Sequence, residues 1–179
     1  MRFVFASDSL KGTISSARAA AILEEEAARA FPNVACTRLA VADGGEGTVD
    51  AVVASLGGAL IEATVSDPLG RPVEATYGML PGNRAIIEMA AASGLPLLTH
   101  AERNPLLTST YGTGQLVLHA LSNGATEVTI AIGGSATNDG GMGAMRALGV
   151  RFLDSAKGEL EGTGADLARV SSIDTSGLD

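Results

Sequence analysis

The chain has 179 residues, of which 46% are hydrophobic and only 3% aromatic, so it can form one ordinary domain whose core consists of Ala, Val, Leu and Ile. Its net charge of −8 disfavours nucleic acid as a partner, because phosphate backbones need a basic face. The single cysteine, Cys36, cannot form an intrachain disulfide, and no signal peptide or membrane-spanning apolar run is recognised, so we expect a cytoplasmic protein with no membrane partner.

The first sixty residues alternate between strand and helix patterns. The elements expected are a strand at Phe3–Ala6, a helix from Ser15 or Ser16 to Phe31, a strand at Ala35–Val41 and a helix at Val49–Leu56. This alternation is typical of a doubly wound, Rossmann-like parallel sheet, in which ligands bind beyond the C-terminal ends of the strands. The polar loops Asp8–Thr13 and Asp43–Thr48 each follow a strand, so we expect both at that edge.

The pattern changes near residue 60 to three strands joined by tight turns without helices. These strands are expected at Leu60–Ser66, Val73–Met79 and Ala85–Met89, and they predict an antiparallel segment. We therefore expect an α/β fold with two domains. Residues 1–66 would form the first part of a Rossmann-like domain, and residues 67–179 a second α/β domain with a mixed sheet. Glu88 lies near the end of the third strand, where it could face a ligand or point outward.

A hydroxyl- and glycine-rich segment precedes the helix expected at Gln115–Leu121. Thr113 in this segment is either the N-cap of that helix or part of an anion-binding helix start. A helical pattern resumes at Met142, Met145 and Leu148. We then expect a short strand at Val150–Leu153, a hairpin turn at Ser155–Gly158 and a short helix at Gly162–Val170. No clear final element is predicted after that helix.

The stretch Ile130–Gly143 runs from a strand through a glycine-rich turn into a helix, which is a layout that binds phosphate through backbone N–H groups. Gly133 and Gly134 leave the approach open, and Asp139 offers a carboxylate to a metal. Further donors come from Ser135, Thr137 and Asn138. The dinucleotide pattern Gly-x-Gly-x-x-Gly and the Walker A pattern are both missing from this stretch. The alternative interpretation is a tight structural connection.

Together the polar loops contain the groups that phosphoryl transfer requires. Carboxylates at Asp8, Asp43 and Asp139 could hold Mg²⁺ or accept a proton, while Lys11 and exposed amides could neutralise developing charge. Hydrolase chemistry is less well supported, because the sequence has no Ser-His-Asp arrangement, nucleophile elbow or zinc-ligand cluster.

Six segments, taken in order, carry a family resemblance. They are Asp8–Gly12, Val41–Thr48, Asp67–Val73, Ile87–Leu95, Asn104–Thr108 with Tyr111–Gly114, and Ile132–Gly141. Over essentially the whole chain these segments resemble the bacterial-type glycerate kinase family, which is unrelated in sequence to the P-loop kinases. Ser7 and Leu10 depart from the proline and phenylalanine usual in that family, and neither change removes a charged group.

The resemblance implies ATP-dependent phosphorylation of D-glycerate with Mg²⁺, with 2-phosphoglycerate favoured over 3-phosphoglycerate as the product. It also implies two α/β domains with the active site in the cleft between them. Family members run well beyond this length, and their later part completes the first domain. We therefore expect that domain to be incomplete here. The sequence does not decide whether the protein forms a homo-oligomer.

The resulting hypothesis divides the candidate residues by role. Asp8 and Lys11 belong to the phosphate or glycerate region, and Asp43 and Asp139 are metal ligands or the general base, without a choice between these roles. The proposed cradle for phosphate or the substrate carboxylate comprises Gly44, Gly45, Glu46, Gly133, Gly134, Ser135, Thr137 and Asn138, with Thr113 as a weaker member. The rival hypothesis is a non-catalytic fragment that folds and binds an anion or self-associates.

Overall fold

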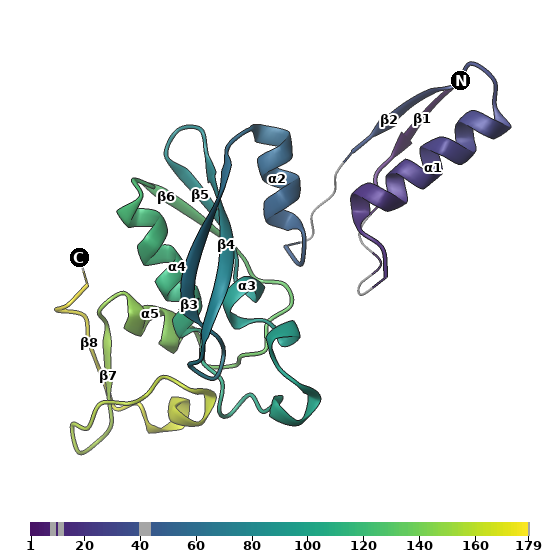
Figure 1. The fold of residues 1–179 in the computed structure, drawn as a ribbon. Coiled ribbons are helices and arrows are strands. Elements are labelled where there is room, and N and C mark those ends of the chain that lie inside the picture. Colours follow the sequence, from purple (N-terminus) through teal and green to yellow (C-terminus); the bar gives the residue numbers. More distant parts are fainter. Residues whose placement is uncertain (8–9, 11–12, 40–43, 179) are drawn as a thin grey trace.

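A computed structural model describes residues 1–7, 10, 13–39 and 44–178. The fold is mixed α/β, as predicted, and its elements are drawn in Figure 1. Within the described part of the chain, no helix is both long enough and apolar enough to cross a membrane.

The N-terminal unit consists of two parallel strands and one helix. Strand β1 (Arg2–Phe5) pairs in parallel with β2 (Ala35–Arg38), and helix α1 (Ser16–Ala30) lies along the pair (Figure 1). Ser15 is the N-cap, because its side chain accepts a hydrogen bond from the backbone N–H of Arg18 at 3.3 Å. Since parallel strands need a crossover connection, the predicted β-α-β order is confirmed for this unit.

A four-stranded mixed sheet forms the centre of the remaining chain. Its strands lie in the order β3 (Ala59–Ser66), β4 (Pro72–Leu80), β5 (Arg84–Glu88) and β6 (Glu127–Ala131). Neighbouring strands pair antiparallel from β3 to β5, and β6 then pairs in parallel with β5. The predicted antiparallel segment and mixed sheet are both confirmed. The expected division between residues 66 and 67 falls between β3 and β4, which pair along their whole length.

Helices cover the two faces of this sheet. Helix α2 (Thr48–Leu56) packs on β4 and β5 from one side, and α4 (Tyr111–Ser122) packs from the other (Figure 1). Alternate strand residues point toward α4 and form the main core with it, where Tyr77, Ile87 and Leu116 are fully buried. The remaining core members are small aliphatic side chains, as the scarcity of aromatic residues requires.

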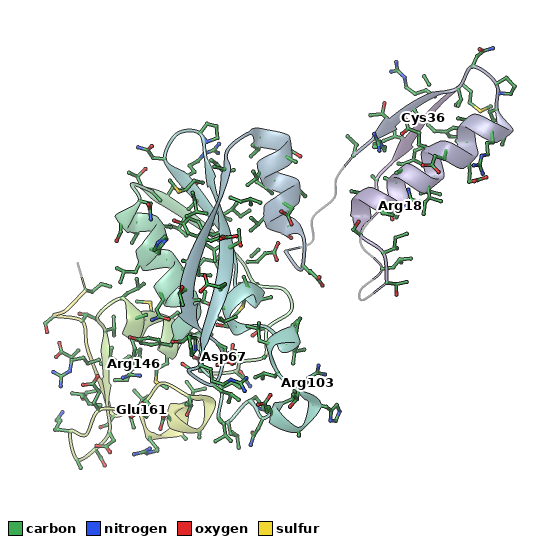
Figure 2. The ribbon with its side chains drawn as sticks, in the orientation of Figure 1. Arg18, Cys36, Asp67, Arg103, Arg146 and Glu161 are labelled. Atoms are coloured by element: carbon green, nitrogen blue, oxygen red, sulfur yellow. The ribbon has the colours of Figure 1, made fainter. Side chains whose placement is uncertain are left out.

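The turn between β3 and β4 is organised by a buried carboxylate. Asp67 is labelled in Figure 2. Its Oδ1 atom accepts hydrogen bonds from the backbone N–H groups of Leu69 (2.8 Å) and Arg71 (2.9 Å), and its Oδ2 atom accepts one from Arg71 Nε at 2.6 Å. Arg71 also pairs with Glu102 at 2.7 Å. The segment Asp67–Val73, one of the six that carry the family resemblance, therefore has a structural role in the turn.

The rest of the chain consists of short elements beyond the sheet. They are α3 (Ala90–Ser93), 3₁₀ turns at Leu95–Leu97 and His100–Glu102, α5 (Met142–Ala147), β7 (Arg151–Leu153), a 3₁₀ helix at Gly164–Arg169 and β8 (Ser172–Asp174). A second small core is formed by Met142 of α5, Phe152 of β7, and the nearby residues Val150 and Leu160. Arg146 of α5 donates a hydrogen bond to the carbonyl of Glu161 (Figure 2).

Two predictions about this region were wrong. The chain does have a final element, because β8 pairs antiparallel with β7. In addition, α4 begins at Tyr111 with Thr110 as its N-cap, so Thr113 is its third residue and not the cap. Glycines at 112 and 114 lower helix propensity, but the helix start packs against β3 and α5, and this tertiary packing outweighs the local preference.

Candidate functional site

The two predicted glycine-rich loops lie against each other. Gly133 follows the end of β6, and its N–H donates to the carbonyl oxygen of Gly44 at 2.8 Å. A Cβ atom on Gly133 would lie 2.7 Å from that oxygen and 2.7 Å from Gly45 Cα, so only glycine permits this approach. The structure thus brings the 44–47 loop and the 133–138 loop to one edge, beyond the C-terminal ends of the parallel strands β5 and β6.

The backbone of the 133–138 loop is held by hydrogen bonds from other parts of the chain. The backbone N–H of Leu95 donates to the carbonyl of Gly134 at 3.0 Å, and Thr108 Oγ1 donates to the carbonyl of Ala136 at 2.9 Å. The Ser135 hydroxyl accepts a hydrogen bond from the N–H of Thr137 at 3.1 Å and shares one with its hydroxyl at 2.9 Å. Gly134 and Asn138 remain exposed, while Ser135 and Thr137 are half-buried. The outer side of the loop is therefore open to a ligand.

Asp139 is buried, with 1% of its surface exposed. Its Oδ2 atom accepts hydrogen bonds from the N–H and the hydroxyl of Thr110, at 2.7 and 2.8 Å, and from the N–H of Gly143 at 3.1 Å. Its Oδ1 atom accepts one from the N–H of Gly141 at 3.0 Å. Both oxygens accept hydrogen bonds from the chain itself, and Asp139 belongs to no group of three potential metal-ligating side chains among the described residues, so this arrangement does not favour the predicted metal-ligand role. Asp139 ties the start of α4 to the start of α5.

Thr113 is also buried, with 3% of its surface exposed. Its hydroxyl lies 2.7 Å from that of Ser93, which is itself fully buried, and 3.5 Å from the carbonyl oxygen of Met89. This geometry does not fit the anion-contact role offered for Thr113. Thr110, the N-cap residue of α4, donates its N–H and its hydroxyl to the carboxylate of Asp139.

The structure also locates Glu88, for which the sequence left two interpretations open. Glu88 ends β5, and its Oε1 atom accepts a hydrogen bond from the backbone N–H of Val49 at 2.7 Å. Burial raises the pKa of the Glu88 carboxyl above its ordinary value, although the Val49 N–H lowers it. The carboxylate therefore points inward at the positive end of α2, and the strongest sequence signal for this was its position at the end of a buried strand.

A cavity of about 230 Å³ lies beside α2 on the same face of the sheet. Its described lining includes the carboxylates of Asp50, Glu74 and Glu88 and no Lys or Arg. This negative lining makes it a poor phosphate site, which leaves the open outer side of the 133–138 loop as the better candidate.

The remaining candidate residues are Gly45, Glu46, Asp8, Lys11 and Asp43. Gly45 is buried and Glu46 is exposed in the loop before α2. Asp8, Lys11 and Asp43 lie outside the described residues. Across the described ranges, no group of three His, Cys, Asp or Glu side chains could hold a metal ion.

Comparison with known proteins decides the family. The model of the Glycerate kinase family matches residues 3–179 of this chain. The chain belongs to the glycerate kinase family. The resemblance inferred from the six motifs is thereby confirmed, and relatives 44–49% identical to the chain are named glycerate kinases.

Individual relatives show what share of their length this chain covers. The chain is 49% identical to glycerate kinase of Bacillus subtilis and 46% identical to glycerate 2-kinase of Escherichia coli, with 100% of this chain and 47% of each relative covered. A crystal structure of a candidate glycerate kinase 2 from Salmonella typhimurium LT2 matches with a TM-score of 0.83 at 44% identity, covering 100% of this chain and 48% of that one. The chain therefore spans about half the length of the relatives that it matches.

Proposed function

We propose that this chain contributes to the transfer of a phosphoryl group from ATP to a hydroxyl group of D-glycerate, with 2-phosphoglycerate as the product. The observation that carries the proposal is the contact between the 44–47 and 133–138 loops at the C-terminal edge of β5 and β6, in a chain of the glycerate kinase family. The relative named glycerate 2-kinase supports the choice of hydroxyl.

The open side of the 133–138 loop is our proposed cradle for a phosphate or for the substrate carboxylate. Gly134 and Asn138 are exposed there, and Ser135 and Thr137 contribute hydroxyl groups. Phosphoryl transfer depends mainly on positioning and charge stabilisation, which backbone amides and hydroxyl groups can supply. Glu46, with Gly44 and Gly45, would border this cradle from the loop before α2.

Asp8, Lys11 and Asp43 stay in the proposal as the charged groups of the site. We propose that Lys11 contacts phosphate, that Asp8 lies in the phosphate or glycerate region, and that Asp43 serves as the general base or a metal ligand. Mg²⁺ would neutralise phosphate charge in this reaction. The described residues of this chain do not form a Mg²⁺ site, and for Asp139 we propose instead that it positions the loop.

We further propose a two-domain protein in which the β1-α1-β2 unit belongs to a Rossmann-like first domain. The boundary that we favour lies before α2, because α2 packs on β4 and β5 and β3 pairs with β4. The single cysteine supports a reducing compartment, and we propose the cytoplasm.

The test is ATP consumption by the purified chain with Mg²⁺, with and without D-glycerate, and with the product identified by mass and NMR. Glycerate-dependent ADP formation with 2-phosphoglycerate would support the proposal. Lys11→Ala should then lower turnover at least about tenfold, as loss of a charge-assisted phosphate contact predicts. The matched control is Lys157→Ala, since Lys157 lies in an exposed turn and donates to Ser172 Oγ at 3.2 Å.

Three results would each count against a part of this proposal. Absence of turnover from a chain shown by circular dichroism to be folded would mean that these residues do not suffice, as the rival hypothesis of a non-catalytic fragment expects. Equal activity of Lys11→Ala and the wild-type chain would remove Lys11 from the site. Formation of 3-phosphoglycerate would overturn the choice of hydroxyl while keeping the substrate.

A further inference from the structure

Glu88 lies where three parts of the candidate site meet. It is the last residue of β5, and its neighbour Met89 donates its backbone N–H to the carbonyl of Ala131, at the end of β6, at 2.9 Å. Two residues beyond Ala131 is Gly133, which contacts the 44–47 loop. The chain therefore leaves β5 after Glu88 at the edge of the sheet where the two glycine-rich loops meet.

The carboxylate of Glu88 contacts the start of α2 from within the protein. Its Oε1 atom accepts the Val49 N–H at 2.7 Å, and the backbone N–H groups of Thr48 and Gly47 also interact with it. The Thr48 N–H also donates to the carbonyl oxygen of Gly45 at 3.2 Å, so the Val49 N–H is the main donor to Glu88. A carboxylate at a helix start is favoured by both hydrogen bonding and the helix dipole. A residue 39 positions later in the chain thus provides the cap that the Gly47 N-cap cannot, since glycine has no side chain.

The 44–47 loop is consequently fixed at both ends of its described part. At one end Gly44 O accepts the Gly133 N–H, and at the other end the first amides of α2 meet Glu88. Two features oppose this arrangement at Glu88: burial disfavours the charged carboxylate, and so does the nearby charge of Asp50. The contacts with the backbone N–H groups at the start of α2 act against these costs, because they favour the charged carboxylate.

We propose that Glu88 is a positioning residue, whose carboxylate holds the start of α2 and thereby keeps the 44–47 loop against the 133–138 loop. This inference deepens the proposed function, because it assigns to the same site the group that sets the distance between its two loops. Glu88 acts here through backbone amides and does not contact a substrate.

Amide hydrogen exchange of the chain 1–179, followed by NMR, tests the coupling directly. In Glu88→Ala the Val49 amide loses its acceptor, and the Gly133 amide should also exchange faster, each by about tenfold or more. Glu88→Gln keeps an oxygen acceptor at the same place and should stay within about threefold of the wild type. The matched control is Glu62→Ala, an exposed carboxylate of β3 that should leave both amides unchanged.

The proposal is decided by which amides exchange faster in the Glu88 variants. Faster exchange at Val49 with unchanged exchange at Gly133 would overturn the proposal, because Glu88 would then be only a helix cap. Unchanged exchange at both amides in a folded Glu88→Ala chain would overturn it as well. If Glu88→Ala does not fold, Glu88→Asp replaces it, since the shorter side chain withdraws the carboxylate from Val49 and should produce the same paired change.

A kinetic measurement separates this proposal from the proposed function. In a chain that forms glycerate-dependent ADP, Glu88→Ala should lower kcat/KM about tenfold or more, and Glu88→Gln should restore most of it. A wild-type chain without turnover would count against the proposed function of this chain, while the exchange data would still decide the role of Glu88. Full kcat/KM in Glu88→Ala would overturn the positioning role.

Discussion

Asp139 Oδ2 accepts hydrogen bonds from both the backbone N–H and the hydroxyl of Thr110, a residue 29 positions earlier. The same oxygen accepts the N–H of Gly143, and Thr110 Oγ1 in turn accepts the N–H of Ala144 at 2.9 Å. This buried network joins the starts of α4 and α5 behind the 133–138 loop. In the folded chain, the carboxylate that the sequence offers as a catalytic candidate joins the starts of two helices.

Replacing Asp139 should therefore cost stability first. Asp139→Ala leaves several buried donors without an acceptor, and we expect the free energy of unfolding in urea to fall by about 3 kcal/mol or more. Asp154 is a suitable control, because its Oδ1 also accepts two backbone N–H groups, at 2.9 and 2.8 Å, but in an exposed turn. Asp154→Ala should cost about 1 kcal/mol. A stable Asp139→Ala chain that has lost only turnover would restore Asp139 as a catalytic candidate.

Gly133→Ala should push the two glycine-rich loops apart. The added Cβ would lie 2.7 Å from Gly44 O and Gly45 Cα, and backbone atoms cannot move aside as a side chain can. We expect a loss of about 1–3 kcal/mol in urea unfolding and faster exchange of the amides near Gly44. Gly158→Ala is the control, because its nearest neighbour is a side-chain oxygen of Asp154 at 3.2 Å. Equal stability of both variants would contradict the close contact.

The hydroxyl pair of Ser93 and Thr113 predicts a coupled effect. Thr113→Val keeps the shape of the side chain but leaves the buried Ser93 hydroxyl without this partner, which should cost about 1–3 kcal/mol. Adding Ser93→Ala should recover part of that loss, so the double variant should be more stable than the sum of the single changes predicts. Thermal unfolding of the four chains in the cycle measures this. Strict additivity would show that the pair is not coupled.

Glu88 predicts a specific pH dependence of stability. Burial raises the pKa of its carboxyl above the ordinary value in the folded chain, with the charge of Asp50 acting in the same direction, and Glu74 lines the same cavity. A raised folded pKa contributes stability that is present below the unfolded pKa and is lost as the pH rises through the folded pKa. The neutral side chain in Glu88→Gln has no such loss.

The free energy of unfolding of Glu88→Gln should therefore improve relative to the wild-type chain as the pH rises from about 4 toward neutrality. Urea unfolding of both chains at a series of pH values measures this difference. Glu62→Gln serves as the exposed control, and its difference from the wild type should change little. A difference for Glu88→Gln that does not vary with pH would contradict the raised pKa.

Much of the fold followed from local patterns. Proline and glycine turns at 67–72 and 81–83 predicted the antiparallel run of β3, β4 and β5, and branched residues predicted β6. The boundaries near α4 and β8 were missed. Helix α4 begins among glycines and hydroxyl residues because it packs against β3 and α5, and β8 exists because β7 provides a pairing partner. Neither contact is visible in a short window of sequence.

The sequence by itself determined the family, through six motifs in a fixed order, and it identified the two glycine-rich loops that lie together. Only the tertiary structure decided what the polar residues around them do. Asp139 and Thr113 became interior groups, and Glu88 became a cap for α2, because hydrogen-bonding partners came from residues between 20 and 39 positions away. A carboxylate serves structure or chemistry according to which donors reach it, and packing of distant elements determines those donors.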